Sequence, residues 1–130
     1  MDFRLVPDLT AAEAERLVRD HLAKNGFDDV QITAHASQDP GRTSVTHPAV
    51  VLAGECWRAT GEAEPHVYPN MPGTGPISSF TKLLGLPTVD TGGVGWAGDR
   101  IHSPNESIRE RDYVVAVKYW GRFLDRFSDE

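Results

Sequence analysis

The apolar pattern near the end of the chain constrains the fold more than any other feature of the sequence. Large apolar side chains recur there at alternating intervals of four and three residues, at Tyr113, Val117, Trp120, Leu124 and Phe127. This spacing places them on one face of an α-helix. We therefore expect a long amphipathic helix whose aromatic face packs into a core, and a second layer of structure for it to cover.

The remainder of the chain predicts an alternation of short strands and helices. Alternating or short apolar runs between breakers predict strands over residues 2–6, 27–34, 65–68 and 86–89. Helical spacing and capping residues predict helices over residues 10–25, 47–60 and 77–84, with a Thr10–Glu13 capping box on the first and Thr46 or His47 as the cap of the second. Ser107 with Glu110 predicts a capping box where the last helix begins. Helices that alternate with short strands are typical of an α/β fold, with α+β as the alternative.

Two features predict how the chain is divided. The opening strand has only one expected neighbour, which leaves a sheet edge that should be paired or covered, so an upstream element is expected to be missing. The polar segment 37–46 contains the breaker Pro40-Gly41 and is typical of a linker. We expect a domain boundary in this segment.

The charge and the cysteine content exclude several classes of function. The net charge of −6 and the isoelectric point near 5.3 give no basic footprint for nucleic acid or an anionic membrane. Cys56 is the only cysteine, so the chain has neither an internal disulfide nor a Cys-x-x-Cys motif. No apolar run reaches membrane-spanning length and the first residues do not form a signal peptide, so we expect a soluble, cytoplasmic protein.

A glycine-rich loop with the sequence GGVGWAGDRIHSPNESI, residues 92–108, leads to the last helix and carries His102. Its glycines permit positive φ angles and close approach to other groups. A histidine between such a loop and a helix start is placed to act as a ligand or a base. The alternative is that His102 is a surface or structural residue, which is the more common role of a lone histidine.

Four stretches of the sequence together resemble a known enzyme family. IHSPNESI, followed by an amphipathic helix, resembles the C-terminal signature of the M20 family of di-zinc metallopeptidases and deacylases, where a histidine in an H-x-x-N-E setting binds a metal. MDFRLVPDLT resembles the family's lid-domain strand, YPNMPGTGPISSF its substrate loop, and GLPTVDTGGVGWAG the strand and loop that lead to the histidine. These stretches follow the family's order along nearly the whole chain.

The resemblance implies a fold, a metal and a reaction. Residues 1–36 are similar to the C-terminal part of a lid and dimerisation domain, and residues 37–130 to the C-terminal part of a metallopeptidase catalytic domain. The complete enzyme hydrolyses an amide bond with metal-activated water at two zinc ions, and His102 would bind one of them. The other ligands and the general base belong to an N-terminal part that has no counterpart here. We therefore assign no catalytic residue and expect the chain to be inactive alone.

The resemblance also implies a substrate-binding role for three residues. Arg4 is similar to an arginine that holds the substrate's free carboxylate, which a guanidinium can bind through two parallel hydrogen bonds. Without the resemblance, Arg4 is interpreted as a solvated strand charge. Gly73 and Thr74 offer backbone N–H groups and a hydroxyl to a carboxylate or an oxyanion, and their alternative is a simple turn.

The residues around His102 have two interpretations each. Asn105 and Glu106 either orient the imidazole, because a metal-bound histidine usually donates its other N–H to an acceptor, or cap the helix locally. Asp99 and Arg100 form either a local ion pair or part of the lining of a site.

The substrate loop favours a peptidase within the family. Succinyl-diaminopimelate desuccinylases carry a loop of the type G-G-T-S-D-G, whereas this chain has Pro72-Gly-Thr-Gly-Pro-Ile77. The latter looks more like the loops of M20 dipeptidases and carboxypeptidase-like members. The implied substrate is a dipeptide or an N-acyl amino acid with a free carboxylate.

Three hypotheses stay open. The first is a fragment of a zinc-dependent amidohydrolase, completed by the missing N-terminal half or accompanied by a homodimer partner. The second is a free-standing noncatalytic α/β module that binds a small carboxylate or a protein partner. The third is a fragment without a stable fold of its own, because its apolar face normally meets an absent half. None of them implies a nucleic-acid or membrane partner.

Overall fold

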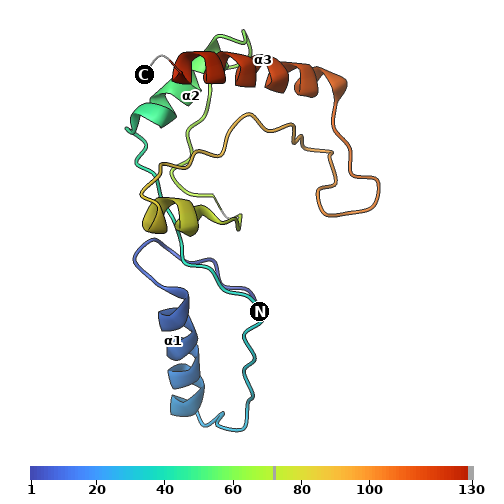
Figure 1. Cartoon of the computed structure of the whole chain (residues 1–130). Helices are drawn as coiled ribbons and strands as arrows, with labels where there is room; N and C mark the ends of the chain where they lie inside the picture. The colour runs from blue at the N-terminus through green and yellow to red at the C-terminus, as the bar shows by residue number, and fades with distance from the viewer. Residues whose placement is uncertain (72, 129–130) are drawn as a thin grey trace. The chain divides into compact units, whose positions relative to one another are not determined.

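The computed structural model describes residues 1–71 and 73–128, whose regular elements are helices joined by long extended segments (Figure 1). These elements are α1 (Ala11–Lys24), α2 (Pro48–Arg58), the single π-helical turn η1 (Ser79–Leu83) and α3 (Glu110–Phe127). The chain divides into two compact units: residues 1–43 with 70–88, and residues 44–69 with 89–130. Within the described residues, no helix has the length and apolarity needed to cross a membrane.

The four predicted strands do not form, so the expected α/β class, and α+β with it, is wrong for the part of the chain that the structure describes. Residues 2–6, 27–34, 65–68 and 86–89 lack the backbone hydrogen-bond ladder of a sheet. Alternation along a sequence specifies a face, but a strand forms only beside a partner strand. Apolar side chains of these segments, among them Val6, Val30 and Tyr68, are accordingly exposed.

The first unit is built around the start of α1. Thr10 Oγ1 accepts a hydrogen bond from the Glu13 N–H at 3.2 Å, and the Glu13 carboxylate accepts one from the Thr10 N–H at 3.0 Å. This is the capping box that the sequence predicts, and the bonds from Thr10 lower the pKa of the Glu13 carboxyl. The next N–H, of Ala11, donates to Asp39 at 2.9 Å, and Asp39 lies 3.7 Å from Lys82 of η1. Asp39 therefore joins the start of α1 to η1.

The polar segment 37–46 is packed within this unit over part of its length. A Cβ at Gly41 would lie 2.6 Å from Ile77 Cγ2 and 2.7 Å from Thr81 Oγ1, so only glycine permits this approach to the start of η1. Thr43 Oγ1 accepts a hydrogen bond from the Thr88 N–H at 2.8 Å. The predicted boundary between residues 36 and 37 stays a prediction.

The core of the second unit lies between α2 and α3, which pack against each other (Figure 1). Leu52, Cys56 and Tyr119 are buried there, and Trp57 and Phe123 pack against them. The rings of Tyr119 and Phe123 stack with centroids 6.1 Å apart. Deep burial of a few large side chains from two helices makes this the best-packed part of the described structure.

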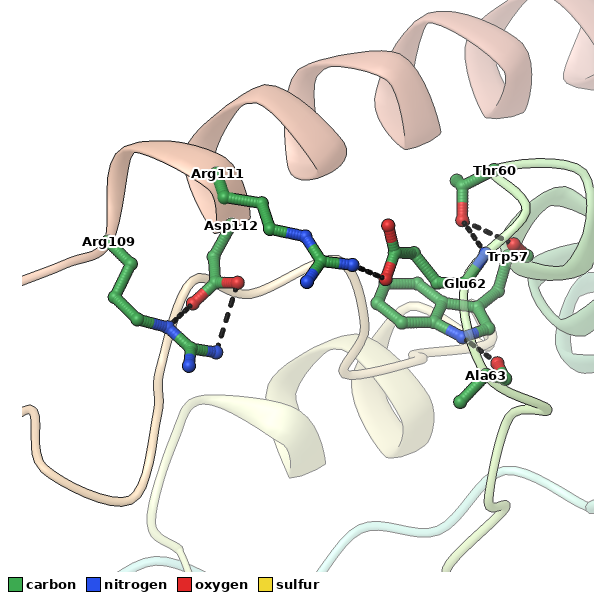
Figure 2. A network of polar contacts seen from close by, with 7 residues as sticks. All are labelled: Trp57, Thr60, Glu62, Ala63, Arg109, Arg111 and Asp112. Atoms are coloured by element: carbon green, nitrogen blue, oxygen red, sulfur yellow. Dashed lines mark hydrogen bonds and ion pairs between the residues drawn. The ribbon is translucent and has the colours of Figure 1, made fainter.

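The start of α2 and the outside of the helix pair are held by polar contacts. Of the two predicted caps of α2, Thr46 and His47, the structure selects His47, whose Nδ1 accepts a hydrogen bond from the Ala49 N–H at 3.1 Å. Figure 2 shows that Arg111 donates to the Glu62 carboxylate, at 2.6 Å, across the turn that follows α2. Arg111 is largely exposed and solvent screens its charge, so this ion pair orients the turn more than it stabilises it.

The predicted orientation of α3 is wrong. Its buried face is formed by Ala116 and Tyr119, with Phe123 partly covered. The stripe expected to face the core is exposed by between 39% and 64%, and its members are Tyr113, Val117, Trp120, Leu124 and Phe127. We call these five residues the outer stripe of α3. The helix is therefore apolar on two adjacent faces, and α2 covers only one of them.

Candidate functional site

Two of the predicted substrate-binding residues meet in the first unit. Arg4 Nη1 donates a hydrogen bond to Thr74 Oγ1 at 2.7 Å, although 70 residues separate them in the sequence. Both side chains are exposed. The contact leaves the remaining guanidinium N–H groups of Arg4 open to solvent beside a hydroxyl, which is an arrangement that a carboxylate can enter.

The loop that carries Thr74 is held at a second point. Arg42 Nη2 donates a hydrogen bond to Asn70 Oδ1. Gly73 is not sterically required, because a Cβ there would meet only the flexible end of Met71, at 2.9 Å. Pro72 of the predicted substrate loop lies outside the described residues. The structure thus brings Arg4 and Thr74 together and adds a contact between Arg42, which lies in none of the motifs, and Asn70 of the predicted substrate loop.

The loop that carries His102 is organised by Asp99. The Asp99 carboxylate accepts hydrogen bonds from the Trp96 N–H at 3.2 Å and the Ile101 N–H at 3.1 Å, and the Asp99 carbonyl accepts one from the Ser107 N–H at 2.9 Å. Asp99 and Arg100 were predicted to form either an ion pair or part of the lining of a site. Among the described residues the ion pair does not form. Asp99 shapes the backbone that presents His102.

The positive φ angles of this loop fall mainly on residues other than glycine. Arg100, His102 and Asn105 have φ angles of 56°, 60° and 64°, whereas among the loop's glycines only Gly92 is positive, at 66°. A non-glycine residue in this region costs on the order of 1 kcal/mol, and such residues cluster at functional sites. The cost at three positions in six residues marks 100–105 as the strained part of the loop.

Asn105 and Glu106 do not contact His102 through a hydrogen bond in the part of the chain that the structure describes. The predicted capping box of Ser107 and Glu110 is also wrong, because α3 begins at Glu110 with Arg109 as its N-cap and without a side-chain cap. Ser107 is engaged elsewhere, since its carbonyl accepts a hydrogen bond from the Trp96 indole N–H at 3.1 Å. The roles of Asn105 and Glu106 as orienting residues stay predictions.

The loop is attached to α3 at Gly92. A Cβ at Gly92 would lie 2.7 Å from the rings of Tyr119 and Trp120, and the Gly92 carbonyl accepts a hydrogen bond from the Trp120 indole at 3.3 Å. Burial raises the pKa of the Tyr119 hydroxyl, and the nearby Thr91 side chain offsets only part of the rise. No described residue meets the geometry of a hydrogen bond to that hydroxyl.

The donor side chains of the described residues do not form a metal site. No group of three or more His, Cys, Asp or Glu side chains in residues 1–71 and 73–128 is arranged to hold a metal ion. His102 is exposed, and a zinc site needs at least three fixed protein ligands. These residues therefore do not fit a complete zinc centre, and His102 can supply one ligand at most.

Comparison with known proteins decides the family. Residues 4–126 match the sequence profile of peptidase family M20/M25/M40. The chain belongs to this family. A solved structure, described as that of the M20 family metallo-carboxypeptidase Sso-CP2 from Sulfolobus solfataricus, matches this M20 chain with a TM-score of 0.83 and 36% sequence identity. The search of the curated proteins found no match.

The structural match covers the two chains very unequally. It includes 92% of this M20 chain but 28% of the Sso-CP2 chain. The resemblance to the M20 family inferred from the four motifs is confirmed by the profile match. The four motifs were sufficient to identify the family because each places glycines, a proline or a charged residue at particular positions. The apolar periodicity of a short helix or strand does not provide such a pattern.

Proposed function

We propose that this M20 chain is the part of a carboxypeptidase-like metallohydrolase that binds the free carboxylate of a peptide or N-acyl amino acid. The hydrogen bond from Arg4 to Thr74 carries the proposal, because it joins the two residues to which the family resemblance gives this role. A carboxypeptidase must recognise the substrate's terminal carboxylate. An arginine beside a hydroxyl provides charge and several donors for that purpose.

The carboxylate-binding role is distributed over three residues. Arg4 supplies the guanidinium, Thr74 supplies a hydroxyl that is held next to it, and Gly73 supplies a backbone N–H without a side chain in the way. Before the substrate arrives, Thr74 accepts from Arg4. A carboxylate would replace this contact with stronger charge-assisted bonds, while the Thr74 hydroxyl turns to donate.

The metal part of the proposal is narrower. His102 is proposed as one ligand of a two-zinc centre, with Asn105 and Glu106 as residues that orient its ring. Because the described donor set does not fit a complete centre, the hydrolytic step is not assigned to this chain. The remaining ligands and the base that accepts the water's proton would come from polypeptide beyond these 130 residues, and the chain alone would not hydrolyse an amide.

The outer stripe of α3 supports the need for further polypeptide. Five large apolar side chains on one helical face are left uncovered by α2, and contiguous exposed apolar surface of this kind marks an interaction site. The Sso-CP2 chain extends far beyond the segment that matches this one. We therefore propose that the stripe packs against the part of an M20 chain that lies outside the match.

The carboxylate site can be tested with a matched ligand pair. N-acetyl-L-alanine carries a free carboxylate, and N-acetyl-L-alaninamide is nearly isosteric but uncharged. We expect only the former to shift the backbone amide signals of Gly73 and Thr74 in NMR titrations of the labelled chain. Arg4→Gln should abolish the response and Arg122→Gln, in the second unit, should leave it unchanged. Equal shifts from both ligands, or an intact response in Arg4→Gln, would contradict the proposal.

The metal role can be tested by isothermal titration of zinc into the chain and into His102→Ala, with folding followed by circular dichroism. A single ligand binds weakly, so neither protein should bind zinc more tightly than about millimolar. Micromolar binding that His102→Ala abolishes would show a complete zinc site within the chain and would overturn this part of the proposal.

The packing role of α3 can be tested with the Sso-CP2 polypeptide from which the matching segment has been removed. We expect this probe to bind the chain, Leu124→Asp to weaken binding at least about tenfold, and Lys118→Glu on the polar face to have little effect. Light scattering on the chain alone gives the competing outcome: a homodimer that Leu124→Asp dissociates would assign the stripe to a second copy.

A noncatalytic carboxylate-binding module is the second candidate function. It is favoured by one observation, namely that the two side chains proposed to bind the carboxylate meet within the chain, whereas residues 1–71 and 73–128 hold no group of three metal donors. The two candidates differ in the mixture with the Sso-CP2 probe. Zinc-dependent release of a C-terminal amino acid, lost in Arg4→Gln, supports the hydrolase, whereas carboxylate binding without activity supports the module.

A further inference from the structure

Two arginines of the first unit, Arg4 and Arg42, differ from most of the other arginines in the chain. Many arginines pair with a carboxylate within 2.8 Å, namely Arg16, Arg19, Arg58, Arg109, Arg111 and Arg126. In residues 1–71 and 73–128, neither Arg4 nor Arg42 forms such a pair, and each donates to a neutral side chain of the same loop. An acidic protein with a net charge of −6 thus keeps two guanidinium groups without an anion at one loop.

The two contacts lie close along that loop. Asn70 binds Arg42 and Thr74 binds Arg4, and four residues of chain span at most about 14 Å. Both guanidinium groups are at the ends of long flexible side chains and both residues are exposed. They can therefore close on two anionic groups that are several ångströms apart on one small ligand.

The carboxylate nearest to Arg42 in the sequence does not neutralise it. Asp39 accepts a hydrogen bond from the Ala11 N–H at 2.9 Å and lies 3.7 Å from Lys82. Asn70 offers Arg42 a single neutral acceptor, whereas a guanidinium has five N–H donors. The positive charge of Arg42 is consequently available to a ligand.

We propose that Arg42 binds a second carboxylate, so that the preferred ligand is an acidic amino acid derivative whose main-chain carboxylate is held by Arg4 and Thr74. The inference rests on the proposed function and adds a substrate class to it. Asn70 holds the Arg42 side chain toward the loop until the ligand is bound, and the ligand's side-chain carboxylate then takes the place of the amide oxygen.

The test compares N-acetyl-L-glutamate with N-acetyl-L-glutamine, which differ only in the charge of the side chain. At physiological salt, we expect the glutamate derivative to bind about tenfold more tightly, as measured by NMR titration of the Thr74 and Asn70 signals. Arg42→Gln should reduce the ratio of the two affinities to about one. Arg42→Lys should retain part of the preference, and Arg122→Gln should retain all of it. Circular dichroism of each variant reports its folding.

The outcomes separate the inference from the function on which it rests. Equal affinities for the two ligands, both lost in Arg4→Gln, would overturn the role of Arg42 and leave the carboxylate site in place. A preference that persists in folded Arg42→Gln would overturn the role of Arg42 as well. Failure of both ligands to bind would contradict the proposed function itself, and the inference with it.

Discussion

The Arg4–Thr74 contact and the His102 loop are built in opposite ways. Arg4 and Thr74 are 70 residues apart and meet through a direct hydrogen bond. His102, Asn105 and Glu106 lie within five positions, yet no hydrogen bond joins them in the described structure, and the loop is held by Asp99 instead. Nearness in sequence therefore does not assemble a site. A single pair of donor side chains, such as a guanidinium beside a hydroxyl, is enough to bind a carboxylate, whereas a metal site needs three or more fixed ligands.

The largest expected effect concerns the attachment of the His102 loop. Gly92→Ala places a Cβ 2.7 Å from Tyr119 and Trp120 at a positive φ angle, so it should lower the free energy of unfolding by roughly 2–4 kcal/mol. Gly93→Ala, where a Cβ meets nothing within 4 Å, is the matched control. Urea unfolding measures both, and equal stabilities would show that the loop is not anchored at Gly92.

The second effect concerns the shape of that loop. Asp99→Ala removes the acceptor of the Trp96 and Ile101 N–H groups and should cost about 1–2 kcal/mol of local stability. Hydrogen exchange of the Ile101 amide should accelerate about tenfold, while Asp90→Ala should leave it unchanged. An unaltered rate would mean that other contacts hold the loop and that the two regions differ less than we describe.

A smaller effect tests the strain at His102. His102→Gly should be more stable than His102→Ala by about 1 kcal/mol, because glycine adopts a φ of 60° without a steric cost. Both variants lack the imidazole, so their difference in thermal unfolding isolates the backbone. If Gly and Ala are equally stable at this position, the loop relaxes readily and the strain does not serve to present the ring.

The smallest effect concerns the pair on the other side of the comparison. A double-mutant cycle with Arg4→Ala and Thr74→Val should give a coupling energy of about 0.5 kcal/mol, since both side chains are exposed. The same variants should nevertheless lose carboxylate binding. A coupling of several kcal/mol would indicate a structural contact instead of one that a ligand can replace.

Contacts between neighbours along the chain were predictable from the sequence, whereas contacts between distant segments were not. The Thr10–Glu13 capping box and the cap of α2 involve neighbours along the chain, so residue identity predicted the first and narrowed the second to Thr46 or His47. A strand at 2–6 or 27–34 would need a partner strand, which the alternation of polar and apolar residues does not identify. Neither strand forms in the described residues. The helix α3 begins at Glu110 because Ser107 is drawn into contacts with Asp99 and Trp96, which lie earlier in the loop.

The candidate site shows the same limit. Arg4 and Thr74 were identified through family motifs, since nothing in their spacing indicates that they meet. Arg42 belongs to no motif, and its contact with Asn70, which lies in the predicted substrate loop, emerged only from the fold. The outer stripe of α3 was recognised as apolar, but periodicity alone could not show that α2 covers the neighbouring face around Ala116 and Tyr119.

The single thiol of the chain, Cys56, provides a way to measure how often the second unit opens. Cys56 has no exposed surface and is not in a disulfide. A labelling reagent can reach its sulfur only when α2 and α3 separate, because the packed interior excludes it. The labelling rate of the unaltered protein therefore reports how often this helix pair opens. If a binding partner covers the outer stripe of α3, labelling of Cys56 should become slower, although Cys56 does not contact that stripe.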